Sequence, residues 1–133
     1  MTAFVDASAL ISMIAGEADA LELAERLEAE SVRLCSALSA WETLAGLRRT
    51  HDMPLESARG RIRAFREAFG IGFVAIGEPE FEIAADAYEQ FGKGRHPAAL
   101  NFGDCLAYAC AKANGASLLF KGEDFVRTDI VAC

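Results

Sequence analysis

The segment Ala99–Ala109, ALNFGDCLAYA, places one acid, Asp104, in the first turn of a helix whose following residues are almost all apolar. A helix that is apolar on every side is typical of a protein interior, where a carboxylate is not needed for folding. Asn101 is a favourable N-cap residue and an acid in the first turn suits the helix dipole, so a helix start alone accounts for Asp104. Other single acids border or interrupt apolar segments, and this repetition favours a functional interpretation: Asp6, Glu42 and Asp124.

Length and composition predict one globular domain over residues 1–133. The chain is 53% hydrophobic, which is enough apolar material for a substantial core. The first apolar run is interrupted by Asp6 and no run is long enough to span a bilayer, so we expect a cytoplasmic protein with no membrane association. The four cysteines have no CxxC spacing, and we interpret them as small core residues or a loose terminal thiol rather than a disulfide or zinc site: Cys35, Cys105, Cys110 and Cys133.

Short apolar strands alternate with helices along the chain. We expect strands over 3–5, 32–35, 72–76 and 117–120, with a short fifth strand over 129–131. We expect helices over 7–15, 17–30, 39–50, 54–69, 79–91 and 101–113. This alternation predicts an α/β fold with a central, mainly parallel sheet of four to five short strands, covered by helices on both faces.

The four acids are predicted to meet at one edge of this sheet. Asp6 and Asp124 directly follow strands, while Glu42 and Asp104 lie near helix starts. In parallel sheets, ligands bind at the carboxyl ends of the strands. A capping box formed by Ser39 and Glu42 is an equally weighted structural explanation for Glu42.

A group of carboxylates at one place requires protons or a cation. Two carboxylates about 4 Å apart repel by roughly 4 kcal/mol at an effective dielectric constant near 20. The only histidines are His51 and His96, and no cysteine cluster accompanies the acids, which disfavours zinc. Oxygen ligands favour Mg²⁺, with Mn²⁺ as a substitute, and such an ion supports phosphodiester hydrolysis.

The charge distribution bears on whether a nucleic acid is the substrate. A net charge of −7 opposes binding to phosphates, but most basic residues lie in the middle of the chain. Arg48 and Arg49, together with Lys93–His96, are candidates for a local basic rim that offsets the acidic charge. A solvated helix face explains the same arginines.

Four segments, taken in order, resemble PIN-domain ribonucleases and in particular the VapC toxins of type II toxin-antitoxin pairs. They are FVDASAL (4–10), SAWETLAGL (39–47), LNFGDCLAYACAKANGA (100–116) and LLFKGEDFVRTDI (118–130). The last two are specific for this group, and the region between residues 48 and 95 is the least diagnostic. The resemblance implies a PIN-like three-layer fold.

The resemblance also implies roles for the four acids. Asp6 and Asp104 would be the principal metal ligands, with Glu42 and Asp124 acting directly or through water. Asp129 is an alternative for the fourth position.

Three neighbouring residues have both a functional and a structural explanation. Ser8 would orient Asp6 or a phosphate oxygen, Asn101 would support Asp104, and Lys121 would contact an RNA phosphate. Helix capping explains the first two, and solvation of a turn explains Lys121.

The function implied by the resemblance is Mg²⁺-dependent endoribonuclease activity, in which activated water attacks the phosphodiester and leaves a 5′-phosphate and a 3′-hydroxyl. The implied partners are RNA, a second copy of the chain, and a VapB-type antitoxin that presents a basic residue to the acids in a hetero-oligomer. The amphipathic segments 7–30 and 54–69 are candidate contact faces, unless the core uses their apolar sides.

Two other classes of protein compete with this interpretation. A phosphoacceptor receiver domain would need an acidic pair after the first strand, where this chain has Asp6 alone. A catalytically silent PIN-like interaction module would have lost its acids, whereas all four positions are filled here.

Overall fold

The computed structural model describes residues 1–133 and is built around a four-stranded sheet in the spatial order β3-β2-β1-β4. The strands are β1 (Thr2–Val5), β2 (Val32–Cys35), β3 (Ile71–Phe73) and β4 (Ser117–Leu119). All three pairings are parallel, and Phe4 in central β1 pairs with Leu34 on one side and Leu118 on the other. Parallel pairing brings the carboxyl ends of all four strands to one edge of the sheet.

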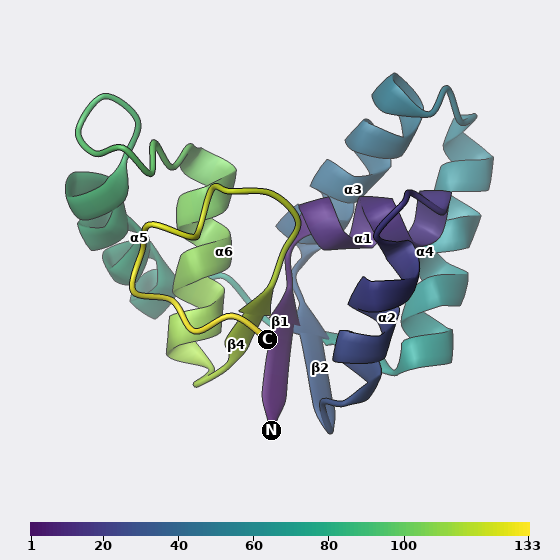
Figure 1. Cartoon of the computed structure of the whole chain (residues 1–133), viewed down its shortest axis with the longest axis horizontal. Helices are drawn as coiled ribbons and strands as arrows, with labels where there is room; N and C mark the ends of the chain where they lie inside the picture. The colour runs from purple at the N-terminus through teal and green to yellow at the C-terminus, as the bar shows by residue number, and fades with distance from the viewer.

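Helices cover both faces of the sheet, which confirms the expected three-layer α/β architecture. Helices α5 and α6 lie on one side and α1 to α4 on the other (Figure 1). The helices are α1 (Ala7–Ala15), α2 (Ala20–Glu28), α3 (Ala37–Thr50), α4 (Leu55–Phe69), α5 (Glu78–Phe91) and α6 (Phe102–Ala113).

The alternation of strand side chains divides the core into two parts. Phe4 and Leu118 belong to the cluster formed with α5 and α6. Val5 and Leu119, the next residues along the same strands, belong to the cluster formed with α1 and α2. This period of two, with apolar residues on both faces, is what a sheet buried between helix layers requires. A smaller cluster around Leu47 joins α3 to α4.

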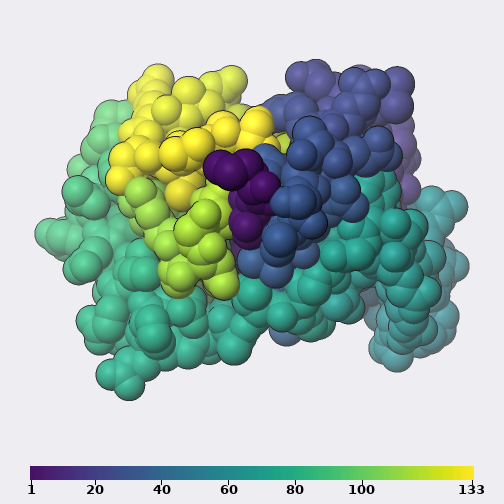
Figure 2. All heavy atoms as spheres, turned by 90° about the horizontal axis from the view of Figure 1, so that it is seen from below, coloured from purple at the N-terminus to yellow at the C-terminus, as the bar shows by residue number.

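The N-terminus lies at the amino end of the sheet, and the last residues of the chain run beside β4, where Ala132 pairs with Leu118. Figure 2 shows the first residues beside the C-terminal segment and the residues of α2 and β2. The Met1 ammonium donates to Ser31 Oγ at 2.8 Å, and Arg26 Nε donates to the carbonyl of Cys133 at 3.0 Å. The acids that follow β1 and β4 are at the opposite end, where the strands finish. No helix has the length and apolar character needed to cross a membrane.

Several element boundaries differ from those expected. Helix α3 begins at Ala37, because Ser36 at the end of β2 is its N-cap and accepts from the amide of Ser39. The expected capping box between Ser39 and Glu42 is therefore wrong, and Glu42 lies in the second turn with its carboxylate uninvolved in capping.

The remaining differences are at β3, α2 and the C-terminal segment. Strand β3 runs over Ile71–Phe73 instead of 72–76, and α2 begins at Ala20 instead of Glu17. Residues 129–131 form no strand, since the only pairing there is an isolated bridge between Leu118 and Ala132. All four cysteines are free, as expected from their spacing.

Candidate metal centre

Asp6 ends β1 and starts α1. Its amide donates to the carbonyl of Leu119 at 2.9 Å, which continues the pairing of β1 with β4. Its carboxylate then caps α1: Oδ2 accepts from the amide of Ser8 at 3.0 Å and from the hydroxyl of Ser8 at 2.5 Å. The side chain is only 7% exposed. Both hydrogen bonds use Oδ2, so Oδ1 has no hydrogen-bond donor from the protein.

Asp104, at the start of α6, also forms one hydrogen bond through its amide and one through its carboxylate. Its amide donates to Asn101 Oδ1 at 2.9 Å, and its Oδ2 accepts from the amide of Asn101 at 3.1 Å. This reciprocal capping confirms the structural explanation for both residues. Oδ1 of Asp104 receives no hydrogen bond from the protein, so capping leaves one carboxylate oxygen free for a ligand.

Glu42 reaches the start of α6 from α3. Its carboxylate lies directly against the α-carbon of Gly103, where a β-carbon would overlap Oε2. Gly103 is buried and immediately precedes Asp104. A residue without a side chain is therefore what allows the Glu42 carboxylate to approach the first turn of α6.

Asp124 and Asp129, the two candidates for the fourth acid, have different surroundings. Asp129 accepts from Tyr108 Oη at 2.5 Å and from Lys112 Nζ at 3.1 Å. Asp124 is exposed and forms no hydrogen bond or ion pair, and its charge raises the pKa of both Asp6 and Asp104. These contacts favour Asp124 for the fourth position.

Electrostatic coupling shows that the fold brings the four acids to one place. Burial, with added repulsion from Asp6 and Asp104, raises the pKa of Glu42 to about 7. Burial also raises the pKa of Asp104 to about 6, with Asp124 and Asp6 contributing in the same direction. The pKa of Asp6 is raised mainly by burial. Asp6, Asp104 and Asp124 thus each raise the pKa of at least one other acid, and the pKa of Glu42 is raised by two of them.

No basic side chain compensates this charge. The ion pairs of the structure do not include any of the four acids. The ammonium of Lys121 instead binds Glu17 at 2.6 Å and Asp19 at 3.3 Å, and His51 binds Glu17 at 2.6 Å. The acids therefore form a region of unpaired negative charge, which is the environment that a cation stabilises.

The donor set fits a hard divalent cation. As the side chains stand, no three histidine, cysteine, aspartate or glutamate residues lie close enough to hold a metal between them. Mg²⁺ does not need such a cage, because it commonly binds one or two carboxylates and retains several waters. Two free Oδ1 oxygens, on Asp6 and Asp104, with two further acids nearby, match that requirement.

Sequence reasoning missed two features of this region. Gly103 was seen only as part of a motif, although its position between a cap residue and an acid signals close approach of another side chain. Glu17, which binds both His51 and Lys121, was expected to begin a helix. Nothing in the local sequence distinguishes Glu17 from the other acids of that segment.

Comparison with known proteins identifies the family. The PIN domain family model matches residues 3–131. Ribonuclease VapC30 of Mycobacterium tuberculosis is 39% identical over 127 residues, which are 95% of this chain and 94% of that protein. The chain therefore belongs to the PIN-domain family and, within it, to the VapC ribonucleases.

Solved structures support the fold. The crystal structure of Mycobacterium tuberculosis VapC20, described as a sarcin-ricin loop cleaving toxin, is similar with a TM-score of 0.71 and 22% identity, covering 98% of both chains. A chain of a toxin-antitoxin complex from Klebsiella pneumoniae is similar with a TM-score of 0.69 and 19% identity, covering 98% of this chain and 96% of that one.

Replacing Gly103 with alanine tests the approach of Glu42 to α6. We expect Gly103→Ala to displace the Glu42 carboxylate and weaken Mn²⁺ binding, measured by calorimetry, while α6 remains folded because alanine favours helices. Gly60→Ala in α4 is the matched control, since its β-carbon meets no atom within 4 Å. Unchanged Mn²⁺ affinity in Gly103→Ala would contradict a role for this contact.

Without a bound metal, the protein should become less stable as the pH rises. The folded pKa values of Glu42 and Asp104 lie above their ordinary values, so the folded state holds these protons more tightly, and this stability is lost as the pH increases toward 7. Acids with lowered pKa, such as Glu17, are already ionised above pH 5.5 and add no opposing change.

In EDTA, we therefore expect a lower urea midpoint at pH 7.5 than at pH 5.5. Glu42→Gln should reduce the corresponding difference in the free energy of unfolding by about 1 kcal/mol, a value discounted because the side chain is only partly buried. Glu25→Gln, at an exposed position of α2, is the control. An equal pH dependence in wild type and Glu42→Gln would refute this account.

Proposed function

We propose that this protein is a Mg²⁺-dependent endoribonuclease, the toxin of a type II toxin-antitoxin pair. Membership of the VapC ribonucleases supports the class of reaction. The observation that carries the metal dependence is the group of four coupled carboxylates without a basic partner at the carboxyl edge of the sheet. Asp6, Glu42, Asp104 and Asp124 are the proposed catalytic residues.

In this proposal the protein holds the cation and orients the phosphodiester. Asp6 and Asp104 would hold Mg²⁺ as its principal ligands, and Glu42 and Asp124 would act on it directly or through water. A bound Mg²⁺ stabilises negative charge on the phosphate and lowers the pKa of a bound water. The water oxygen forms a bond to phosphorus while the bond from phosphorus to O3′ breaks. The products are a 5′-phosphate and a 3′-hydroxyl, and no side chain becomes covalently attached.

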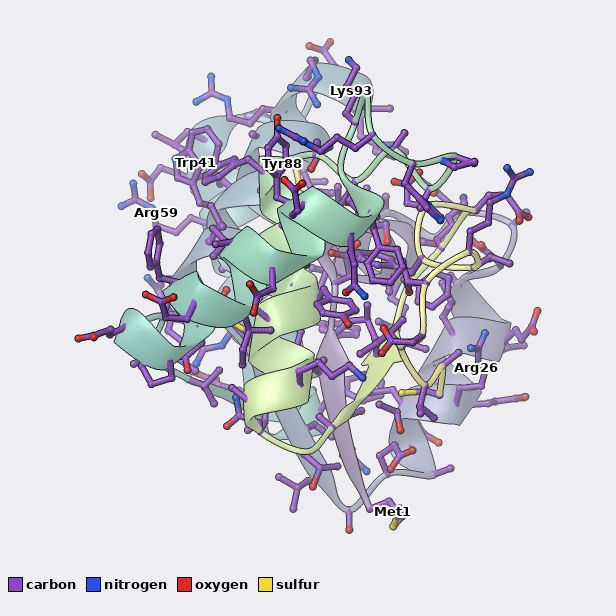
Figure 3. All side chains as sticks on the ribbon, turned by 90° about the vertical axis from the view of Figure 1, so that its left-hand side faces the viewer. Met1, Arg26, Trp41, Arg59, Tyr88 and Lys93 are labelled. Carbon is purple, nitrogen blue, oxygen red and sulfur yellow. The ribbon has the colours of Figure 1, made fainter.

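Basic residues at the same end of the molecule as the four acids are proposed to bind RNA phosphates. Lys93 lies at the end opposite Met1 in Figure 3. Arg48 and Arg49 are exposed in the last turn of α3 and have no ion-pair partner. Lys121 is a weaker candidate than expected from sequence, because its ammonium is bound by Glu17 and Asp19.

Cleavage of total cellular RNA by the purified protein tests the proposed function. We expect discrete fragments in Mg²⁺ or Mn²⁺ and none in EDTA, because the acids need a cation to engage a phosphate. Asp6→Asn and Asp104→Asn should reduce cleavage to the level of the buffer. Equal cleavage by all three proteins would indicate contamination and reject the acid site. Metal binding without cleavage by the wild type would favour the silent interaction module.

An antitoxin is the proposed regulatory partner. The similar chain from Klebsiella pneumoniae comes from a toxin-antitoxin complex, and the relatives are VapC ribonucleases. The unpaired carboxylates offer a site for a basic side chain of such a partner, since a charge-assisted hydrogen bond forms readily between them. A cation from the antitoxin would compete with Mg²⁺ for the same acids.

A second copy of the chain is proposed to cover an apolar face. The expected contact faces on segments 7–30 and 54–69 are largely used by the core, through residues such as Leu23 and Ile62. Large apolar side chains are instead exposed on α3, β3, α5 and α6: Trp41, Phe73, Phe81, Tyr88 and Phe102. Three of them line an entirely apolar hollow of about 400 Å³ between α5 and α6. Exposed apolar surface of this kind is typical of protein interfaces.

Light scattering on the isolated chain tests the proposed homodimer. We expect the mass of a dimer for the wild type and a shift toward the monomer for Phe81→Ser, because Phe81 is 63% exposed at the edge of the hollow. Leu21→Ser on α2 is the control, since Leu21 is 73% exposed but lies outside this face. A monomeric wild type, or equal dissociation in both variants, would argue against this interface.

A further inference from the structure

A cluster of charged residues lies beside the acid site but takes no part in the proposed chemistry. Glu17, in the turn between α1 and α2, binds Lys121 Nζ through Oε1 and His51 Nε2 through Oε2, both at 2.6 Å. Asp19 in the same turn is 3.3 Å from Lys121 Nζ and accepts a hydrogen bond from the buried hydroxyl of Ser12. Three segments therefore meet at the Glu17 carboxylate: the turn between α1 and α2, the end of α3, and the residues that follow β4.

Lys121 is also connected to the acid site through its backbone. Its amide donates to Ser8 Oγ at 3.0 Å, and that hydroxyl donates to Asp6 Oδ2 at 2.5 Å. Because Ser8 Oγ accepts from an amide, its single proton is directed to the carboxylate. Lys121 thus contacts the turn after α1 through its side chain. Through its backbone amide it contacts the Ser8 hydroxyl, which orients Asp6.

Asp124, three residues further along, depends on its neighbours for its position. Its carboxylate is exposed and forms no hydrogen bond or ion pair of its own. The loop is held at its far end by Phe125, which is 2% exposed and packs against Phe120 with ring centroids 5.2 Å apart. Between the two ends, Gly122 has a φ of +98°, which a residue with a side chain adopts only under strain. Lys121 is the anchor at the near end.

We propose that Glu17 and Lys121 are positioning residues, whose ion pair holds the loop carrying Asp124 and the hydroxyl of Ser8 in the arrangement that the metal centre uses. The inference rests on the proposed function, because it assigns these residues a purpose in metal binding. In this role neither residue contacts the ion, and the ammonium of Lys121 binds Glu17 rather than an RNA phosphate.

Removing either member of the pair should weaken metal binding more than it weakens the fold. Exposed ion pairs contribute little to stability, and Lys121 and Glu17 both reach the surface. Loss of a residue that orients a metal ligand typically lowers metal affinity by about 10-fold or more. The two effects are therefore separable by experiment.

The test is calorimetric measurement of Mn²⁺ binding to the full chain, with urea unfolding of the same proteins. We expect Lys121→Met and Glu17→Gln each to weaken Mn²⁺ binding by roughly 10-fold. The double variant should be little worse than either single variant, because both remove the same interaction. Lys121→Arg should retain most of the affinity, since a guanidinium still pairs with Glu17. Added Mn²⁺ should restore much of the lost RNA cleavage.

Two controls separate the inference from the proposed function. Glu22→Gln, an exposed acid on α2, should bind Mn²⁺ like the wild type. Asp6→Asn should lose both binding and cleavage, and its failure to do so would reject the proposed function itself. If Asp6→Asn is inactive while Lys121→Met and Glu17→Gln keep the wild-type Mn²⁺ affinity, the positioning role is overturned and the acid site stands. Strictly additive losses in the double variant would also contradict it.

Discussion

The concentration of negative charge at the carboxyl edge of the sheet is the constraint on which the rest of the structure depends. Asp6 is almost fully buried there, and both Asp6 and Asp104 are close enough to Glu42 to raise its pKa. Such an arrangement is unfavourable without a cation, so it persists because apolar packing on both sheet faces fixes the elements that carry the acids. The free energy gained by packing the core thus offsets the repulsion between the carboxylates at this edge of the sheet.

In two of the acids, helix capping is compatible with the proposed metal binding. Asp6 and Asp104 each use Oδ2 to accept hydrogen bonds at a helix start, and each leaves Oδ1 without a donor from the protein. The cap fixes the rotamer of the carboxylate, which reduces the freedom that a ligand would otherwise have to remove. The structural explanation for an acid at a helix start therefore does not compete with the functional one. Capping describes how the carboxylate of the proposed ligand is oriented.

The fold was predictable from sequence because its signals are local, whereas part of the candidate site was not. Alternating apolar strands and helices are enough to predict the parallel sheet and its carboxyl edge. The start of α3 was misplaced because Ser36 and Ser39 are both good caps, and only the end of β2 decides between them. The contacts of Glu17 join residues 34 and 104 positions apart, and no local pattern encodes such pairing.

The arrangement of charge also explains how an acidic protein can accept the proposed RNA substrate. Lys121, three residues before Asp124, is bound by Glu17 and Asp19, so it does not neutralise the four acids. Arg48 and Arg49 lie in the last turn of α3 and Lys93 in the loop after α5, and these two helices cover opposite faces of the sheet (Figure 1). An RNA strand that contacted both groups, as proposed, would pass over the acids. We therefore expect the separation of acidic and basic groups, rather than the net charge of −7, to govern whether an RNA phosphate reaches the acids.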